Sequence, residues 1–203
     1  MPKKIIDEES LKEQNDSLPA EPAALGLTGL GVAALVIGSG YLELTSGVDK
    51  LLMIPWVLFF GACAQLIAGI TDFKRNNIFG ATVFSVYAFA MFSIALTLFF
   101  VIFGNVNFDI SHYGFGLIAI LVFSLIATLA SLMAHKILLI ILIMVDIAVI
   151  GLIFHYLSGA PTFVGGLFLI FTSILSFYAV SAILINTMAN KTVLPLGEPV
   201  WNP

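Results

Sequence analysis

Six long apolar runs, separated by short polar segments, constrain this chain more than any other feature of its sequence. The hydrocarbon core of a bilayer is about 30 Å thick, and a helix needs roughly 20 apolar residues to cross it. All but one of the runs lack Asp, Glu, Lys and Arg, and the exception carries only Asp146. The predicted spans are residues 23–41, 51–70, 78–103, 114–134, 137–154 and 162–187.

Composition supports the same class of protein. Hydrophobic residues make up 60% of the chain and charged residues only 10%, whereas a soluble domain has about 25% charged residues. This excludes an ordinary water-soluble enzyme, a disordered chain and a nucleic-acid-binding protein, which needs a basic surface. Continuous apolar runs favour helices over the alternating strands of a membrane barrel. We therefore predict an all-α integral membrane protein with six transmembrane helices.

The distribution of basic residues predicts the orientation of these helices. An even number of spans places both termini on one side of the membrane, and only Lys50 then falls on the other side. Because cytoplasmic segments carry an excess of Lys and Arg, both termini are predicted to be cytoplasmic. The basic residues on the side of the termini are Lys3, Lys4, Lys12, Lys74, Arg75, Lys136 and Lys191.

The short connections between spans leave no room for a domain outside the membrane. We predict three parts: a polar cytoplasmic tail over residues 1–20, a six-helix transmembrane domain over residues 21–187, and a second cytoplasmic tail over residues 188–203. The first part alternates acids with lysines, which is typical of a solvated segment.

Asp146 is the most unusual residue within the predicted spans. It lies near the middle of span 137–154, and Lys136 is about 15 Å away along the same helix. Protonating an aspartate at pH 7 costs roughly 4 kcal/mol, so an ionised form needs water or donors from other helices. Two hypotheses follow for Asp146: a proton-linked or solvent-facing group in a pathway, or a hydrogen-bonded tie between helices.

Gln65 is the second polar residue of interest. Gly61, Gln65 and Gly69 are spaced by four, so they share one face of the helix predicted over residues 51–70. A buried amide needs hydrogen-bond partners. We expect Gln65 either to pack against a neighbouring helix or to line a narrow path.

Sites for catalysis or for a metal are not indicated. His112, His135 and His155 lie in a loop or at span ends and lack the spacing of a helical metal-binding pair. Cys63 is the one cysteine, which excludes a disulfide framework and a cysteine-based zinc site. We predict that the protein is not an enzyme and binds neither a metal nor a cofactor.

Three stretches of the chain carry a more specific signal. Residues 21–31 are EPAALGLTGLG, residues 61–69 are GACAQLIAG and are followed by DFKRNNIFG at 72–80, and residues 192–198 are TVLPLGE. In order, spacing and placement these stretches resemble the acetate uptake transporter family, also called the acetate/succinate permease family. The similarity extends over nearly the whole chain.

The resemblance implies a function in the plasma membrane. It implies passage of acetate, and in some members succinate, usually coupled to protons. It also implies a homo-oligomer, a hexamer, in which each subunit has its own pathway through the lipid bilayer, and it implies no nucleic-acid partner.

The resemblance also implies an apolar constriction built from the first, third and fifth helices. The family's positions fall on Leu30, Tyr87 and Val145, of which only Tyr87 is the family's own residue. A narrow apolar ring with one phenol would admit a two-carbon acid more readily than a bulky one. Gln65 is expected to lie on the same pathway.

The mouth of the pathway is expected near the start of two helices. Helix N-termini attract anions, and Pro22 and Asn77 precede the first and third predicted spans. Glu21 and Ala24 stand where the family has asparagine and proline, which predicts a more acidic and less rigid mouth.

Physical chemistry gives a separate reason to expect proton coupling. Neutralising a carboxylate at pH 7 costs roughly 3.7 kcal/mol, and moving the bare anion through an apolar ring costs at least several kcal/mol. Proton-linked acetate uptake is therefore the favoured prediction. The alternatives are a channel for a neutral small solute such as urea or ammonia and, in another class, a membrane sensor or scaffold without flux.

Overall fold

The computed structural model describes residues 18–44, 47–104 and 109–202. Within these residues it contains six helices that are long and apolar enough to cross a membrane, and no strand, so the predicted all-α class is confirmed. The spans are Ala23–Tyr41, Lys50–Lys74, Ile78–Phe103, Ser111–Met133, Lys136–Ser158 and Phe163–Ala189. Most of the predicted N-terminal tail, residues 1–17, lies outside the described residues.

Four of the spans are single helices, and two are composite. The single helices are α2 (Ala23–Tyr41), α5 (Ile78–Phe103), α7 (Lys136–Ser158) and α8 (Phe163–Ala189). The fourth span joins α6 (Ser111–Ala130) to the 3₁₀ turn η3 (Ser131–Met133). The second span begins within η1 (Gly47–Leu52). It continues as α3 (Met53–Trp56), the π-helical segment η2 (Val57–Ala64) and α4 (Gln65–Lys74).

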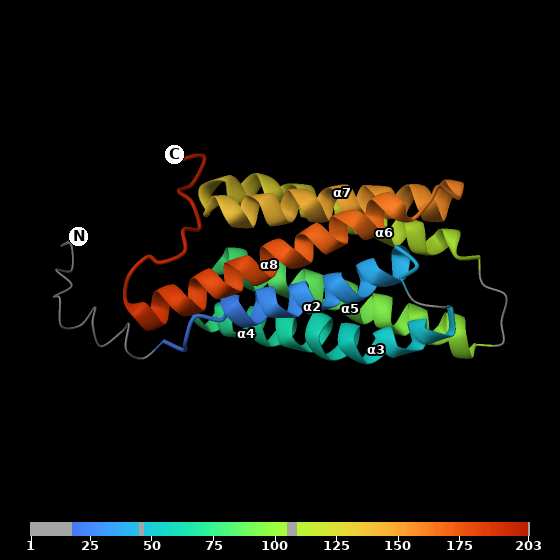
Figure 1. Cartoon of the computed structure of the whole chain (residues 1–203), viewed down its shortest axis with the longest axis horizontal. Helices are drawn as coiled ribbons and strands as arrows, with labels where there is room; N and C mark the ends of the chain where they lie inside the picture. The colour runs from blue at the N-terminus through green and yellow to red at the C-terminus, as the bar shows by residue number, and fades with distance from the viewer. Residues whose placement is uncertain (1–17, 45–46, 105–108, 203) are drawn as a thin grey trace, which may run out of the picture.

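The helices form an elongated bundle, shown in Figure 1. Helix α2 packs against α8, η2 and α4, and α5 packs against α4 and η2. Helix α7 joins α8 to α6. The start of α2 and the end of α8 lie at the same end of the bundle, on the left of Figure 1, as an even number of crossings requires.

Small residues allow the helices of this bundle to approach closely. The backbone carbonyl of Phe60 would lie 2.5 Å from a Cβ placed on Gly29, and the carbonyl of Gly166 would lie 3.0 Å from one placed on Gly38. Because lipid tails are as apolar as the side chains, close packing of this kind drives helix association in membranes. The hydroxyl of Ser173 adds a hydrogen bond of 2.7 Å to the carbonyl of Gly31, which joins α8 to α2.

The second span is longer than its apolar run predicts. It extends to Lys74 rather than to residue 70 and therefore includes the fully buried Asp72. The prediction that Asp146 is the one acidic residue within the spans is wrong for this reason. The side-chain amide of Asn77 donates to Oδ1 of Asp72 at 3.0 Å. This hydrogen bond supports a buried carboxylate in the last turns of the helix, and hydropathy alone does not predict it.

The described part of the C-terminal tail packs back on the bundle. The Asn186 amide accepts from the backbone N–H groups of Val193 and Leu194 at 2.7 and 2.9 Å. The carbonyl of Leu196 then accepts from the N–H of Ile137 at 3.1 Å, so the tail satisfies backbone donors in the first turn of α7.

The close contact at Gly29 predicts a difference between two glycines. Gly29→Ala forces η2 away from α2 and should destabilise the protein by about 1–3 kcal/mol. Thermal unfolding in detergent measures the effect. Gly116→Ala is the matched control, because a Cβ there meets nothing within 4 Å. It should stabilise α6 by about 0.5–1 kcal/mol, and equal unfolding temperatures for the two variants would contradict the packing argument.

Candidate functional site

A cavity of about 90 Å³ lies near the end of the bundle where α2 begins; we name it the near cavity. The first turns of α2, α5 and α7 reach it, and α4 contributes polar side chains. Its lining residues are Ala23, Leu27, Leu30, Gln65, Asp72, Asn77, Phe79, Gly80, Val83, Phe84, Tyr87, His135, Leu138, Ile141 and Leu142. Four of the predicted site residues, Leu30, Gln65, Asn77 and Tyr87, are therefore brought together.

A larger cavity of about 330 Å³, the far cavity, lies at the opposite end of the bundle. Three tyrosines give it an aromatic wall. The hydroxyls of Tyr41 and Tyr156 are 2.7 Å apart, and the ring of Tyr113 packs edge-on against Tyr156 with centroids 4.7 Å apart. Lys50 and His155 also line this cavity.

An apolar layer separates the two cavities. On α2, Leu30 lines the near cavity and Ile37 lines the far one, a separation of about 10 Å along the helix. We name as the apolar layer Ala33 and Ala34, which lie between Leu30 and Ile37 on α2, together with Met91, Val145 and Val149, which belong to the same buried cluster as Tyr87. Val145 lines neither cavity.

Tyr87 lines the near cavity and belongs to the same buried cluster as the apolar layer. It is 4% exposed, and its ring packs edge-on against Phe123 with centroids 6.0 Å apart. Its hydroxyl lies 2.7 Å from the hydroxyl of Ser124 on α6. The phenol lines the near cavity and is held in its position by a neighbouring helix.

Asp146 is bonded by hydroxyls from α6. Ser124 donates to Oδ1 of Asp146, and Thr128 donates to Oδ2 at 2.7 Å. These contacts make Asp146 a tie between α6 and α7, which is one of the two hypotheses drawn from the sequence. They also connect it to Tyr87 through Ser124, so the carboxylate is linked to the wall of the near cavity.

Gln65 is fully buried and only partly satisfied. Its side-chain nitrogen donates to the carbonyl of Gly61 at 2.8 Å, which fixes the orientation of the amide. Its Oε1 atom has no hydrogen-bond partner among the described residues. A buried acceptor left unpaired is costly, so this oxygen is suited to a donor that enters the cavity.

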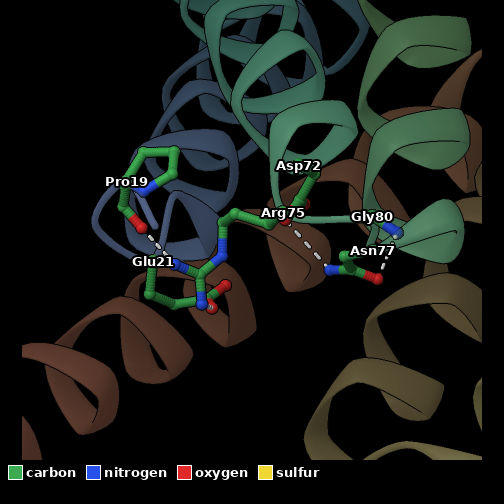
Figure 2. Close-up of polar contacts among 6 residues, drawn as sticks. All are labelled: Pro19, Glu21, Asp72, Arg75, Asn77 and Gly80. Atoms are coloured by element: carbon green, nitrogen blue, oxygen red, sulfur yellow. Dashed lines mark hydrogen bonds and ion pairs between the residues drawn. The ribbon is translucent and has the colours of Figure 1, made fainter. Parts of the chain in front are cut away.

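Asp72 and Asn77 form a second polar group in the near cavity (Figure 2). The side-chain oxygen of Asn77 accepts from the backbone N–H of Gly80 at 3.2 Å and caps α5, while its nitrogen donates to Asp72. The position of Gly80 requires glycine, since a Cβ there would overlap Oδ2 of Asp72. That oxygen has no partner within the described part of the chain.

The charge of Glu21 is compensated at the predicted mouth. Figure 2 shows Arg75 between Pro19 and Glu21: Nη2 of Arg75 lies 2.9 Å from Oε2 of Glu21, and Nη1 donates to the carbonyl of Pro19. Pro22 directly precedes α2, and its carbonyl accepts from the N–H of Gly26 at 3.1 Å. The acidic character predicted for the mouth from Glu21 is thus offset by Arg75.

His135 caps α7 and lines the near cavity. Its Nδ1 accepts from the backbone N–H of Leu138 at 3.2 Å, which requires that this nitrogen be unprotonated. Burial lowers the pKa of His135 below its usual value of 6.5. The imidazole is therefore held neutral beside the cavity, with its second nitrogen as a donor.

Sequence reasoning missed Ser124, Thr128, Asp72 and His135 as site residues. Ser124 and Thr128 are spaced by four in a span without charged residues, so they share one helix face. That spacing was the available signal for a partner to Asp146. Among the described residues, no group of three or more His, Cys, Asp and Glu side chains is placed to hold a metal ion.

The fold defines a class: a multi-pass membrane protein with six helices and a cavity toward each end of the bundle. The chain belongs to the GPR1/FUN34/yaaH family, whose model matches residues 8–198. This confirms the family resemblance predicted from the three motif-bearing stretches.

Individual relatives agree with this assignment. The succinate-acetate/proton symporter SatP of Escherichia coli strain K12 is 34% identical over 71 residues, as is the protein of the same name from Shigella flexneri. The matched segment covers 34% of this chain and 35% of the relative, so the chain spans about a third of the length of the curated relatives it matches. A solved structure described as that of the bacterial acetate channel SatP has a TM-score of 0.82 at 22% identity, covers 88% of this chain and 99% of that one, and shows the same fold.

The cap formed by His135 predicts a dependence of stability on pH. Because the pKa of His135 is lower in the folded than in the unfolded state, its contribution is present above pH 6.5 and is lost as the pH falls below that value. Loss of an N-cap costs about 1 kcal/mol. His135→Asn keeps an acceptor that does not titrate, so its unfolding temperature should fall less on acidification than that of the wild type. Equal acid sensitivity of the two proteins would contradict this role.

Proposed function

We propose that the protein transports acetate, and other small carboxylic acids such as succinate, across the plasma membrane by proton-linked uptake through a path within each subunit. The observation that carries this proposal is the pair of cavities on either side of the apolar layer, with Tyr87 and Gln65 at its near side. The names of the relatives, a succinate-acetate/proton symporter and an acetate channel, support the choice of substrate.

The size and lining of the near cavity favour a small acid. About 90 Å³ accommodates a two-carbon molecule with little room for water. Leu30 and Tyr87 line the near cavity and Val145 belongs to the buried apolar cluster that includes Tyr87, so a charged group that leaves water there pays a desolvation penalty. Passage of a carboxylate together with a proton lowers that penalty, which is the physical basis for proton linkage.

The orientation follows from the arrangement of basic residues. Lys74, Arg75, Lys136 and Lys191 lie at the end of the bundle where α2 begins and α8 ends, whereas Lys50 lies at the far cavity. By the positive-inside rule, the near cavity opens toward the cytoplasm and both termini are cytoplasmic. We also infer a homo-oligomer, a hexamer by family resemblance, in which each subunit transports independently.

Uptake of labelled acetate by proteoliposomes under an imposed pH gradient tests the proposal. We expect uptake above that of protein-free liposomes, and we expect unlabelled acetate and succinate, but not urea, to compete with the label. Competition by urea or ammonia would favour the alternative of a channel for neutral solutes. Absence of any flux would favour a sensor or scaffold.

Enlarging the side chain at the constriction should block the path. Leu30→Trp places an indole in the near cavity and should reduce acetate uptake about tenfold or more, the effect of a barrier raised by about 1.4 kcal/mol. Leu35→Trp is the matched control on the same helix, because Leu35 is exposed on the outside of the bundle. Similar uptake by both variants would overturn the assignment of Leu30 to the pathway.

Asp146 should affect the pH dependence of uptake. Asp146→Asn keeps the shape of the side chain but replaces the carboxyl group by an amide that cannot ionise, so the pH profile of acetate uptake should change. Asp109→Asn removes an exposed carboxylate outside the spans and should leave the profile as in the wild type. A profile unaltered by Asp146→Asn would show that this carboxylate is a structural tie alone.

A further inference from the structure

Three side chains form a continuous hydrogen-bonded chain between the buried carboxylate and the near cavity. Asp146 on α7 bonds to Ser124 on α6, and Ser124 bonds to Tyr87 on α5. Ser124 is completely buried, and Asp146 and Tyr87 are 6% and 4% exposed. Bulk water therefore does not reach these three side chains and does not compete for their hydrogen bonds.

The donation from Ser124 to Asp146 gives this series of hydrogen bonds a direction. A carboxylate only accepts hydrogen bonds, and both oxygens of Asp146 are paired with hydroxyls, those of Ser124 and Thr128. A serine hydroxyl has one proton. Since Ser124 uses that proton toward Asp146, its oxygen can only accept from Tyr87.

This direction fixes the orientation of the Tyr87 hydroxyl. Its phenol proton is directed to Ser124 at 2.7 Å, so only the lone pairs of its oxygen remain for another partner. Tyr87 is also the single hydroxyl among the residues that line the near cavity. While Ser124 donates to Asp146, the phenol oxygen thus has no proton to offer to a molecule in the cavity.

We propose that Ser124 is a positioning residue that, through Asp146, turns the Tyr87 hydroxyl into a pure acceptor and thereby selects the protonated, neutral form of the carboxylic acid at the constriction. The inference rests on the proposed passage of acids along Tyr87. A carboxylic acid has an O–H to donate to the phenol oxygen, whereas its anion has only lone pairs and is repelled by those of Tyr87.

The other polar groups of the near cavity agree with this selection. Oε1 of Gln65 and Oδ2 of Asp72 are acceptors without a partner among the described residues, while the nitrogens of Gln65 and Asn77 each donate one of their two protons, to Gly61 and to Asp72. The titratable groups that line the cavity are Asp72 and His135. His135 supplies one donor at the mouth, which suits the carbonyl oxygen of a neutral acid.

The decisive quantity is the charge moved per acetate transported. Passage of the neutral acid moves no net charge, whereas passage of the anion moves one. The experiment uses the full-length protein in liposomes and measures acetate-driven charge movement together with uptake of labelled acetate. Protein-free liposomes provide the correction for acid that crosses the bilayer directly.

Ser124→Ala removes the hydroxyl that links Tyr87 to Asp146 and does not enlarge any side chain. The Tyr87 proton is then free to point to the anion and to stabilise it by a hydrogen bond, so the charge moved per acetate should rise from near zero toward one. Ser124→Thr retains a hydroxyl and should restore the wild-type ratio. Should Ser124→Ala fail to fold, Ser124→Cys, with a thiol that is a weak donor and acceptor, should raise the ratio in the same direction.

A matched control separates this effect from a general loosening of the bundle. Ser93 lies on α5 with Tyr87 and is exposed, and its hydroxyl returns to the carbonyl of Phe89 at 3.0 Å. Ser93→Ala should leave the ratio unchanged. A wild-type ratio in folded Ser124→Ala, or one charge per acetate already in the wild type, would overturn the positioning role, whereas absence of labelled uptake in the wild type would overturn the proposed function itself.

Discussion

Polar groups inside a bilayer must find their partners within the protein, because the lipid offers none. This constraint explains the helical backbone, and it also organises the few polar side chains between the helices. The hydroxyls of Thr28, Thr71 and Ser181 return to carbonyls of their own helices. Both side-chain oxygens of Asp146 are instead bonded by residues of another helix, Ser124 and Thr128 of the neighbouring α6.

The contacts of Asp146 connect three helices of the bundle. Helix α6 meets α7 through the carboxylate and meets α5 through the bond between Ser124 and Tyr87. One serine thus holds together two helices that contribute to the apolar layer. Because Tyr87 belongs to the apolar layer's buried cluster and also lines the near cavity, this bond holds a residue that is common to both.

Much of the architecture was predictable, and the reasons are local. The predicted spans 23–41 and 78–103 match α2 and α5 at both ends, since Pro22 and Asn77 precede their first turns and glycine follows α5. The span of α4 was predicted too short because hydropathy treats Asp72 as a terminator, whereas the amide of Asn77 gives it a partner. Leu30, Gln65 and Tyr87 were predicted as pathway residues and share the near cavity.

The sequence alone determined the class of protein, the family and the number of helices, because apolar length and motif spacing are properties of consecutive residues. Only the tertiary structure decided how those residues act together. Ser124 and Asp146 are far apart in the chain, and no rule of spacing pairs a hydroxyl of one helix with a carboxylate of another. Their contact depends on how α6 and α7 pack against each other, which the order of residues within either helix does not specify.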